Sequence, residues 1–133
     1  MNYGLYYKEV EFNRHSIDTV RKAISGDLDW KKGSLHSSQR STRSSEVAWI
    51  RDMNLLSMLM RMSKQINRQA HWNLNISGVE PVQFGIYGKG DFYDWHVDQH
   101  LKPVNNVVRK ISMTLFLNDD YEGGEFDLEI YRP

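Results

Sequence analysis

The 133-residue sequence has no cysteine and no excess charge of either sign, with 17 Lys and Arg residues against 17 Asp and Glu residues. The missing thiol excludes disulfide frameworks, thiolate nucleophiles and cysteine-ligated zinc or iron–sulfur sites. The balanced charge argues against a protein that wraps nucleic acid or lies on an anionic membrane.

Long apolar runs are also absent, since none approaches the roughly 18 residues of a membrane span. The first ten residues mix Tyr, Lys and Glu and do not resemble a signal peptide. Apolar residues nevertheless make up 40% of the chain, enough for a hydrophobic core. We therefore expect one intracellular, cytoplasmic domain without membrane attachment.

The first part of the chain predicts two helices. Apolar residues recur at helical spacing at Ile17, Val20 and Ile24, with Ser16 or Asn13 as the cap. A longer pattern over residues 53–70 carries leucines and methionines on one face, and we expect these methionines to pack in the core rather than bind a metal. Around the helices we expect, in chain order, a strand at 3–12, a short strand at 30–35 and a polar loop at 36–45.

From residue 81 onward the pattern changes to strands. Runs at 82–86 and 92–98 alternate on either side of a Gly-Lys-Gly-Asp break at 88–91, which predicts a hairpin. Further strands are predicted at 111–117 and from 126, separated by a turn at 118–124. Helices followed by antiparallel strands indicate an α+β domain whose chemistry lies on the sheet.

The segment Asp94-Trp-His-Val-Asp98 contains the most informative pair. In an extended chain, residues two apart share a face, so His96 and Asp98 are expected side by side. An imidazole and a carboxylate are two of the three donors in the 2-His-1-carboxylate arrangement that binds iron(II). An isolated pair of this kind is a weak signal, because many such pairs lie on ordinary surfaces.

The surrounding sequence makes the signal specific. Residues 80–98 read EPVQFGIYGKGDFYDWHVD, residues 110–118 read KISMTLFLN, and residues 121–125 read YEGGE. Together with residues 72–78, these motifs resemble the iron(II)- and 2-oxoglutarate-dependent dioxygenases of the prolyl 4-hydroxylase superfamily. The resemblance is strongest to the PKHD-type hydroxylase branch, which includes phage-encoded members.

The resemblance implies a double-stranded β-helix, or jelly-roll. N-terminal helices in residues 1–80 would support it, and residues 81–133 would form its first strands. It implies Fe(II), 2-oxoglutarate and ascorbate as cofactors, with O2 consumed and succinate and CO2 released. His96 and Asp98 would be metal ligands and catalytic residues. Tyr87, Ser112 and Thr114 would bind 2-oxoglutarate, and Phe116 on the same face stands where several relatives have a tyrosine.

Two parts of the family's site are not matched. The second histidine ligand and the basic partner of 2-oxoglutarate come from later strands in relatives. We therefore expect this chain to be the amino-terminal portion of a longer hydroxylase, with a β-helix incomplete at its C-terminal end. His100 is a possible substitute ligand, although its segment resembles the start of a loop. Five basic residues could form a rim near the site, although the balanced charge favours a solvated surface for them: Arg40, Arg43, Lys102, Arg109 and Lys110.

The resemblance leaves the substrate open. A peptidyl substrate, in particular a prolyl residue, is the first expectation, and small molecules are an alternative. A nucleic-acid base is disfavoured by the balanced charge. From a different class, the chain could be a non-catalytic interaction module or a half-enzyme completed by a second polypeptide. Open sheet edges would then favour a homo-oligomer or a complementing chain.

Overall fold

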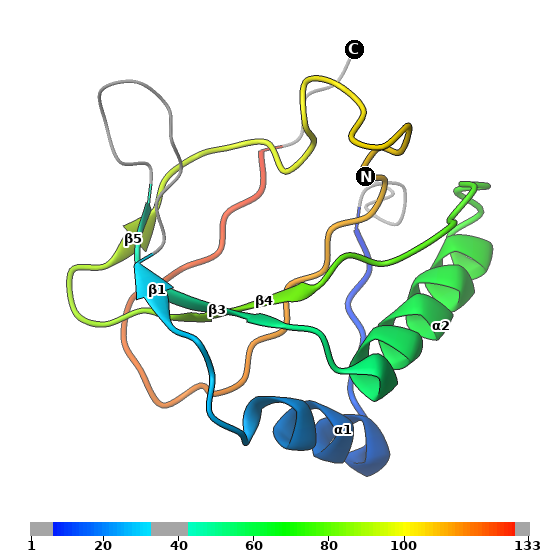
Figure 1. Cartoon of the computed structure of the whole chain (residues 1–133). Helices are drawn as coiled ribbons and strands as arrows, with labels where there is room; N and C mark the ends of the chain where they lie inside the picture. The colour runs from blue at the N-terminus through cyan, green and yellow to red at the C-terminus, as the bar shows by residue number, and fades with distance from the viewer. Residues whose placement is uncertain (1–6, 33–42, 130–133) are drawn as a thin grey trace.

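The computed structural model describes residues 7–32 and 43–129 (Figure 1). Its elements in chain order are α1 (Arg14–Ile24), β1 (Lys31–Lys32), β2 (Arg43–Ser44), β3 (Glu46–Ile50), α2 (Met53–Gln69), β4 (Val82–Ile86) and β5 (Phe92–Tyr93). The domain is therefore α+β, as predicted, with two helices and small antiparallel sheets.

Side-chain caps define where both predicted helices begin. Of the two candidate caps for α1, Asn13 is the one used, because its Oδ1 accepts a hydrogen bond from the Ser16 backbone N–H at 2.9 Å. Asp52 caps α2 in the same way, accepting from the Leu55 N–H at 2.8 Å. Each cap satisfies an N–H that has no partner inside the helix. The predictions of both helices are confirmed.

The main sheet has three antiparallel strands in the order β1-β3-β4. Ala48 pairs with Phe84 on one face, and Trp49 pairs with Gln83 on the other. Phe84 packs against the hydrophobic core, so the first face covers the helices. The second face is turned away from them and carries the candidate site described below.

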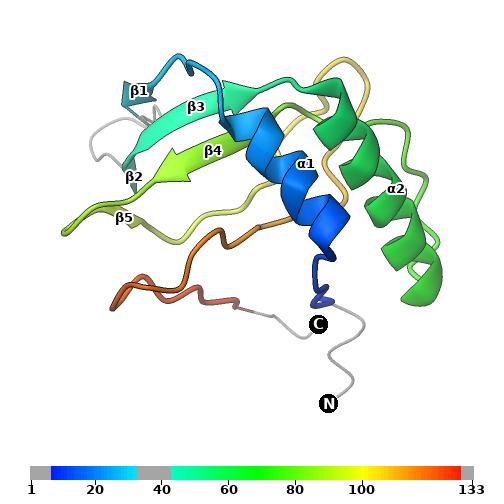
Figure 2. The ribbon, with the colours of Figure 1, turned by 90° about the horizontal axis from the view of Figure 1, so that it is seen from below.

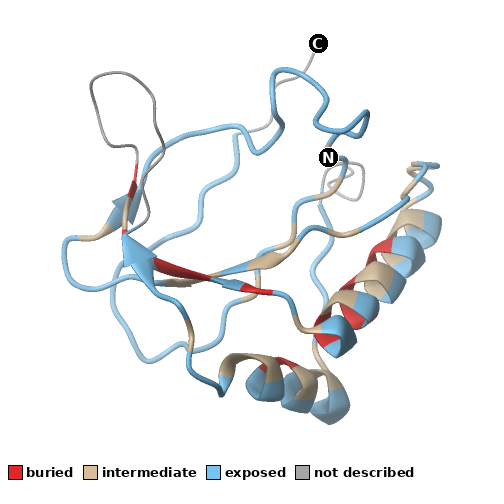
Figure 3. Ribbon diagram, in the orientation of Figure 1, coloured by how far each residue is buried: buried red, intermediate tan, exposed pale blue. Residues whose placement is uncertain are grey.

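The core lies between the sheet and the helices, which pack side by side (Figures 1 and 2). Its buried members are Val20, Ile50, Leu55, Met58 and Leu59. Met58 is thus a core residue and Met62 packs against the same cluster, as predicted, whereas Met60 is only half-buried and does not belong to this cluster. None of the described residues beyond Ser63 is buried, as Figure 3 shows for the C-terminal half.

The predicted hairpin at residues 88–91 is wrong in one respect. The turn forms, with the Asp91 N–H donating to the Gly88 carbonyl at 3.0 Å and Gly90 at a φ of 86°. However, β4 pairs with β3 whereas β5 pairs with β2, so the flanking strands belong to different sheets. β5 also ends at Tyr93 rather than continuing to residue 98.

The strand predicted at 111–117 is not formed, although its side chains alternate as expected. Met113 and Leu115 pack against the core, while Ser112 and Thr114 are exposed. The segment lacks a strand ladder, which requires a neighbouring strand to accept and donate its backbone hydrogen bonds. It turns back after residue 118, and Phe126 meets Phe116 edge to face at 5.9 Å between centroids.

Two further strand predictions are not borne out in the described residues, since 7–12 and 126–129 have no regular structure. The remaining residues of those predictions, and 36–42 of the predicted loop, lie outside the described parts. A double-stranded β-helix is accordingly not confirmed by the structure itself. No helix within 7–32 and 43–129 is long and apolar enough to cross a membrane.

Candidate metal and cosubstrate site

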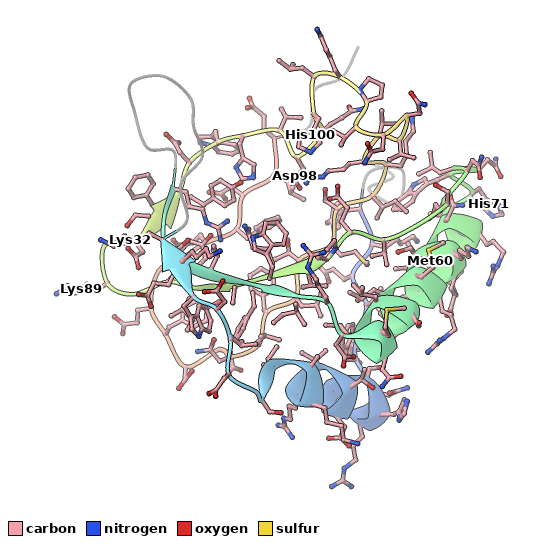
Figure 4. The ribbon with its side chains drawn as sticks, viewed as in Figure 1. Lys32, Met60, His71, Lys89, Asp98 and His100 are labelled. Atoms are coloured by element: carbon pink, nitrogen blue, oxygen red, sulfur yellow. The ribbon has the colours of Figure 1, made fainter. Side chains whose placement is uncertain are left out.

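His96 and Asp98 lie in contact, as predicted, on the side of the sheet away from α1, where Figure 4 labels Asp98. The His96 Nε2 atom is 3.1 Å from Asp98 Oδ1, and both side chains are partly exposed. The segment that carries them follows β5 and has no regular secondary structure. Their proximity therefore does not come from a strand, which was the basis of the prediction.

Hydrogen bonding determines which nitrogen of His96 is available to a ligand. Its Nδ1 atom lies 2.7 Å from the main-chain oxygen of Asp94. Because a carbonyl oxygen can only accept, Nδ1 carries the proton, and Nε2 of the neutral ring presents a lone pair. This lone pair faces a carboxylate oxygen of Asp98, so a proton or a metal ion is needed between the two acceptors.

The distance between these two atoms fits a metal ion. Two bonds of about 2.1 Å that meet at a right angle separate their donor atoms by about 3.0 Å. The observed 3.1 Å between Nε2 and Oδ1 agrees with that value. In the described residues, however, no three His, Asp or Glu side chains form a group able to hold a metal. His100 therefore does not complete the pair, and the structure presents two suitable donors.

Arg109 holds the backbone at Asp98. Its Nη1 donates to the Asp98 carbonyl at 2.8 Å, and its Nε donates to Glu80 Oε2 at 2.7 Å. The expectation of a purely solvated arginine is therefore wrong for this residue, which is half-buried. A segment without strand hydrogen bonds is instead restrained by a charge-assisted bond to a side chain.

Arg43 was also expected on the surface, but only 5% of it is exposed. Its Nε donates to Ser45 Oγ at 2.6 Å, and its Nη1 donates to Gln83 Oε1. The guanidinium lies over the rings of Tyr87, at 5.5 Å, and Tyr93, at 4.7 Å. The alternation of Arg43, Ser45 and Val47, all of them buried, was the available sequence signal for a strand here.

The three predicted cosubstrate residues occupy different surroundings. Tyr87 lies directly after β4, not within a strand, and is half-exposed beside Arg43. Ser112 and Thr114 share an exposed face of their segment, in which they alternate with residues that pack against the core. The roles of all three remain predictions.

A depression of about 250 Å³ lies next to this region. It is lined by Trp49, Arg51, Glu80, Pro81 and Arg109. Arg109 links it to the Asp98 backbone, and the exposed indole of Trp49 provides a flat apolar surface. The depression therefore adjoins the backbone of one of the two proposed metal ligands.

Asp91 joins the turn at 88–91 to β2, since it accepts from Ser44 Oγ at 2.5 Å and from the Gly88 N–H at 2.8 Å. These two hydrogen bonds, the Ser44 bond first, lower the pKa of Asp91 below its ordinary value of 3.8. Because the pKa of Asp91 is lower in the folded than in the unfolded state, its ionised carboxylate stabilises the fold at pH values above the unfolded-state pKa. This stabilisation is lost as the pH falls through the folded-state pKa.

We therefore expect Asp91→Ala to unfold at lower urea concentration than the wild type at neutral pH, with a smaller difference near pH 3. Asp18→Ala, at an exposed position of α1, is the control and should change the midpoint little at neutral pH. Urea titrations at both pH values measure the effect. If the urea midpoint of Asp91→Ala differed from that of the wild type by the same amount at both pH values, this role would be contradicted.

Comparison with known proteins identifies the region that holds the His96–Asp98 pair. Residues 82–133 match the model of the 2OG-Fe(II) oxygenase superfamily. Over 72 residues, 53% of the chain, the sequence is 36% identical to a PKHD-type hydroxylase of Picosynechococcus sp.. The two matches support an assignment of the chain to the 2OG-Fe(II) oxygenase superfamily. The chain spans 32% of that hydroxylase's length, and no solved structure matches it.

The 2OG-Fe(II) oxygenase superfamily consists of oxidoreductases that use iron(II) and 2-oxoglutarate. It also implies a jelly-roll fold. Tyr87, His96, Asp98, Ser112 and Thr114 all lie within the segment that matches the superfamily model. The contact between His96 and Asp98 therefore lies within the segment that matches the superfamily model.

Proposed function

We propose that this chain carries the metal-binding part of an iron(II)- and 2-oxoglutarate-dependent hydroxylase. The observation that supports it is the contact between His96 Nε2 and Asp98 Oδ1, two acceptors at a spacing that suits a divalent metal, within the superfamily segment. His96 and Asp98 would hold the iron. When bound, the iron activates O2 for oxidation of 2-oxoglutarate to succinate and CO2, coupled to hydroxylation of the substrate.

The protein side chains have separate tasks in this proposal. The Asp94 carbonyl keeps the Nδ1 proton on His96, so that Nε2 stays available for the metal. Tyr87, Ser112 and Thr114 would contact 2-oxoglutarate, the tyrosine through its hydroxyl. Burial, the largest influence, raises the pKa of Tyr93, so its phenol remains neutral beside the site.

A peptidyl substrate, and specifically a prolyl residue, is the substrate that we propose. The depression beside Asp98 supports it, because an exposed tryptophan offers a flat apolar surface for a proline ring. Arg51 and Arg109 on its wall can donate hydrogen bonds to peptide carbonyls. Ascorbate would keep the iron reduced between turnovers.

Succinate release tests the proposal. The full chain, supplied with iron(II), ascorbate, O2 and 2-oxoglutarate, should form succinate faster when a proline-rich peptide is added. A peptide with every proline replaced by alanine is the control, and Asp98→Ala should form no succinate with either. Succinate formation that Asp98→Ala retains in full would contradict the proposed function, whereas equal stimulation by both peptides would contradict only the prolyl substrate.

A half-enzyme completed by a second polypeptide is the second candidate. Large apolar side chains close to the ligand pair are strongly exposed, with values of 63% for Trp95, 81% for Val97 and 105% for Leu101. A patch of this kind indicates a surface that another chain covers. Metal binding without succinate formation in the assay above would favour this candidate.

A further inference from the structure

Arg43 occupies a position that is costly for a charge. Moving a charged side chain out of water costs several kcal/mol unless the protein replaces its hydration. Ser45 Oγ and Gln83 Oε1 each accept a hydrogen bond from the Arg43 guanidinium, which joins β2 to β4. The position is also shaped by Gly85, where an added Cβ would lie 3.0 Å from Arg43 Nη2 and 3.2 Å from the Tyr87 ring.

A stack of rings connects this buried charge to the proposed metal ligand. The Tyr93 ring lies parallel to the His96 imidazole, with centroids 3.7 Å apart and an interplanar angle of 10°. The Arg43 guanidinium also lies over the Tyr93 ring, with its Cζ atom 4.7 Å from the same centroid. The three groups therefore form a connected sequence that begins in the sheet and ends at His96.

We propose that Arg43 is a positioning residue that holds the His96 imidazole in its metal-binding orientation through Tyr93. The segment after β5 has no strand hydrogen bonds, so the imidazole is restrained by the stack on Tyr93 together with the Nδ1 contact to the Asp94 carbonyl. Arg43 attracts the electron-rich face of Tyr93 and fixes that ring against β2. A cation over an aromatic ring thus supports this ligand in addition to the hydrogen bond between His96 Nδ1 and the Asp94 carbonyl.

The inference rests on the proposed function only in taking His96 as a metal ligand, and the two can be tested apart. Without metal, NMR of the full chain should show His96 ring protons shifted upfield by the Tyr93 ring current. We expect this shift to persist in Tyr93→Phe, which keeps the ring, and to disappear in Tyr93→Leu. Arg43→Met, which keeps a long stem without charge, should reduce the shift.

Metal affinity provides the second readout, measured by calorimetry with cobalt(II), a redox-stable substitute for iron(II). Loss of an outer support of a ligating histidine typically lowers metal affinity by about 10- to 100-fold. We expect a loss in this range for Arg43→Met and Tyr93→Leu, and near wild-type affinity for Tyr93→Phe. Arg61→Met is the matched control, because Arg61 is exposed on α2, away from the site.

These measurements distinguish the positioning role of Arg43 from the proposed function of the chain. A wild-type chain that binds no cobalt(II) but shows the variant-dependent NMR shifts would contradict the proposed function and support the positioning role. Folded Arg43→Met with unchanged His96 resonances would overturn the positioning role. If circular dichroism shows that Arg43→Met does not fold, the comparison of Tyr93→Leu with Tyr93→Phe replaces it. Equal His96 resonances in those two variants would overturn the positioning role.

Discussion

Replacing His96 by alanine is expected to abolish metal binding. In the described residues the candidate site has two donors in contact, and removing one leaves a single carboxylate that water competes with effectively. Asp98→Ala should have the same effect, because the imidazole alone is likewise a poor site. The loss expected in either variant is complete within the range of the measurement.

Anaerobic titration with iron(II) and 2-oxoglutarate measures this effect through the visible absorption band of the chelated metal. The band should appear in the wild type and be absent from both variants. His15→Ala, an exposed histidine of α1, controls for loss of any imidazole and should keep the band. A band of full intensity in His96→Ala would show that the metal lies elsewhere and would end the assignment of this pair.

The largest expected effect on stability comes from Leu55→Ala. Only 2% of Leu55 is exposed, and it packs in α2 against the core formed with Ile50 and Val20. Shortening a leucine in such a place typically lowers the free energy of unfolding by about 2–5 kcal/mol, through lost burial and the cavity that remains. Since domains of this size are stable by only about 5–15 kcal/mol, the variant should be close to unfolding.

Met53 offers a control on the same helix, because 72% of it is exposed. Met53→Ala should change the free energy of unfolding by less than about 0.5 kcal/mol. Urea unfolding followed by circular dichroism compares the two variants with the wild type. Equal midpoints for Leu55→Ala and Met53→Ala would mean that the core does not lie where the structure places it.

Local patterns in the sequence were sufficient for the helices. Apolar spacing predicted α1 and α2, and Asn13 was one of the two candidate caps. Helix hydrogen bonds join residues close in the chain, so the information that specifies them is local. The alternation in β4 predicted that strand for a similar reason, since Val82 and Phe84 must both reach the core.

The ligand pair was predicted from spacing and from the family resemblance, but its supports were not. His96 and Asp98 are only two residues apart, so their contact forms within one short segment even though that segment is irregular. Arg43 is more than fifty positions from His96 in the chain, and its burial depends on the pairing of β2 with β5. Arg109 reaches Asp98 across eleven positions of irregular chain, with Glu80 as its other partner.

By itself the sequence determined the two helices and the apolar face of α2, and it indicated the superfamily and the candidate ligands. Only the tertiary structure decided which extended segments became strands, because a strand needs a hydrogen-bonding neighbour that its own residues do not specify. It also decided that Arg43 is buried beside Tyr93, since burial depends on what distant segments place around a side chain. The chemistry of the site is thus encoded locally, and its geometry is imposed by the fold.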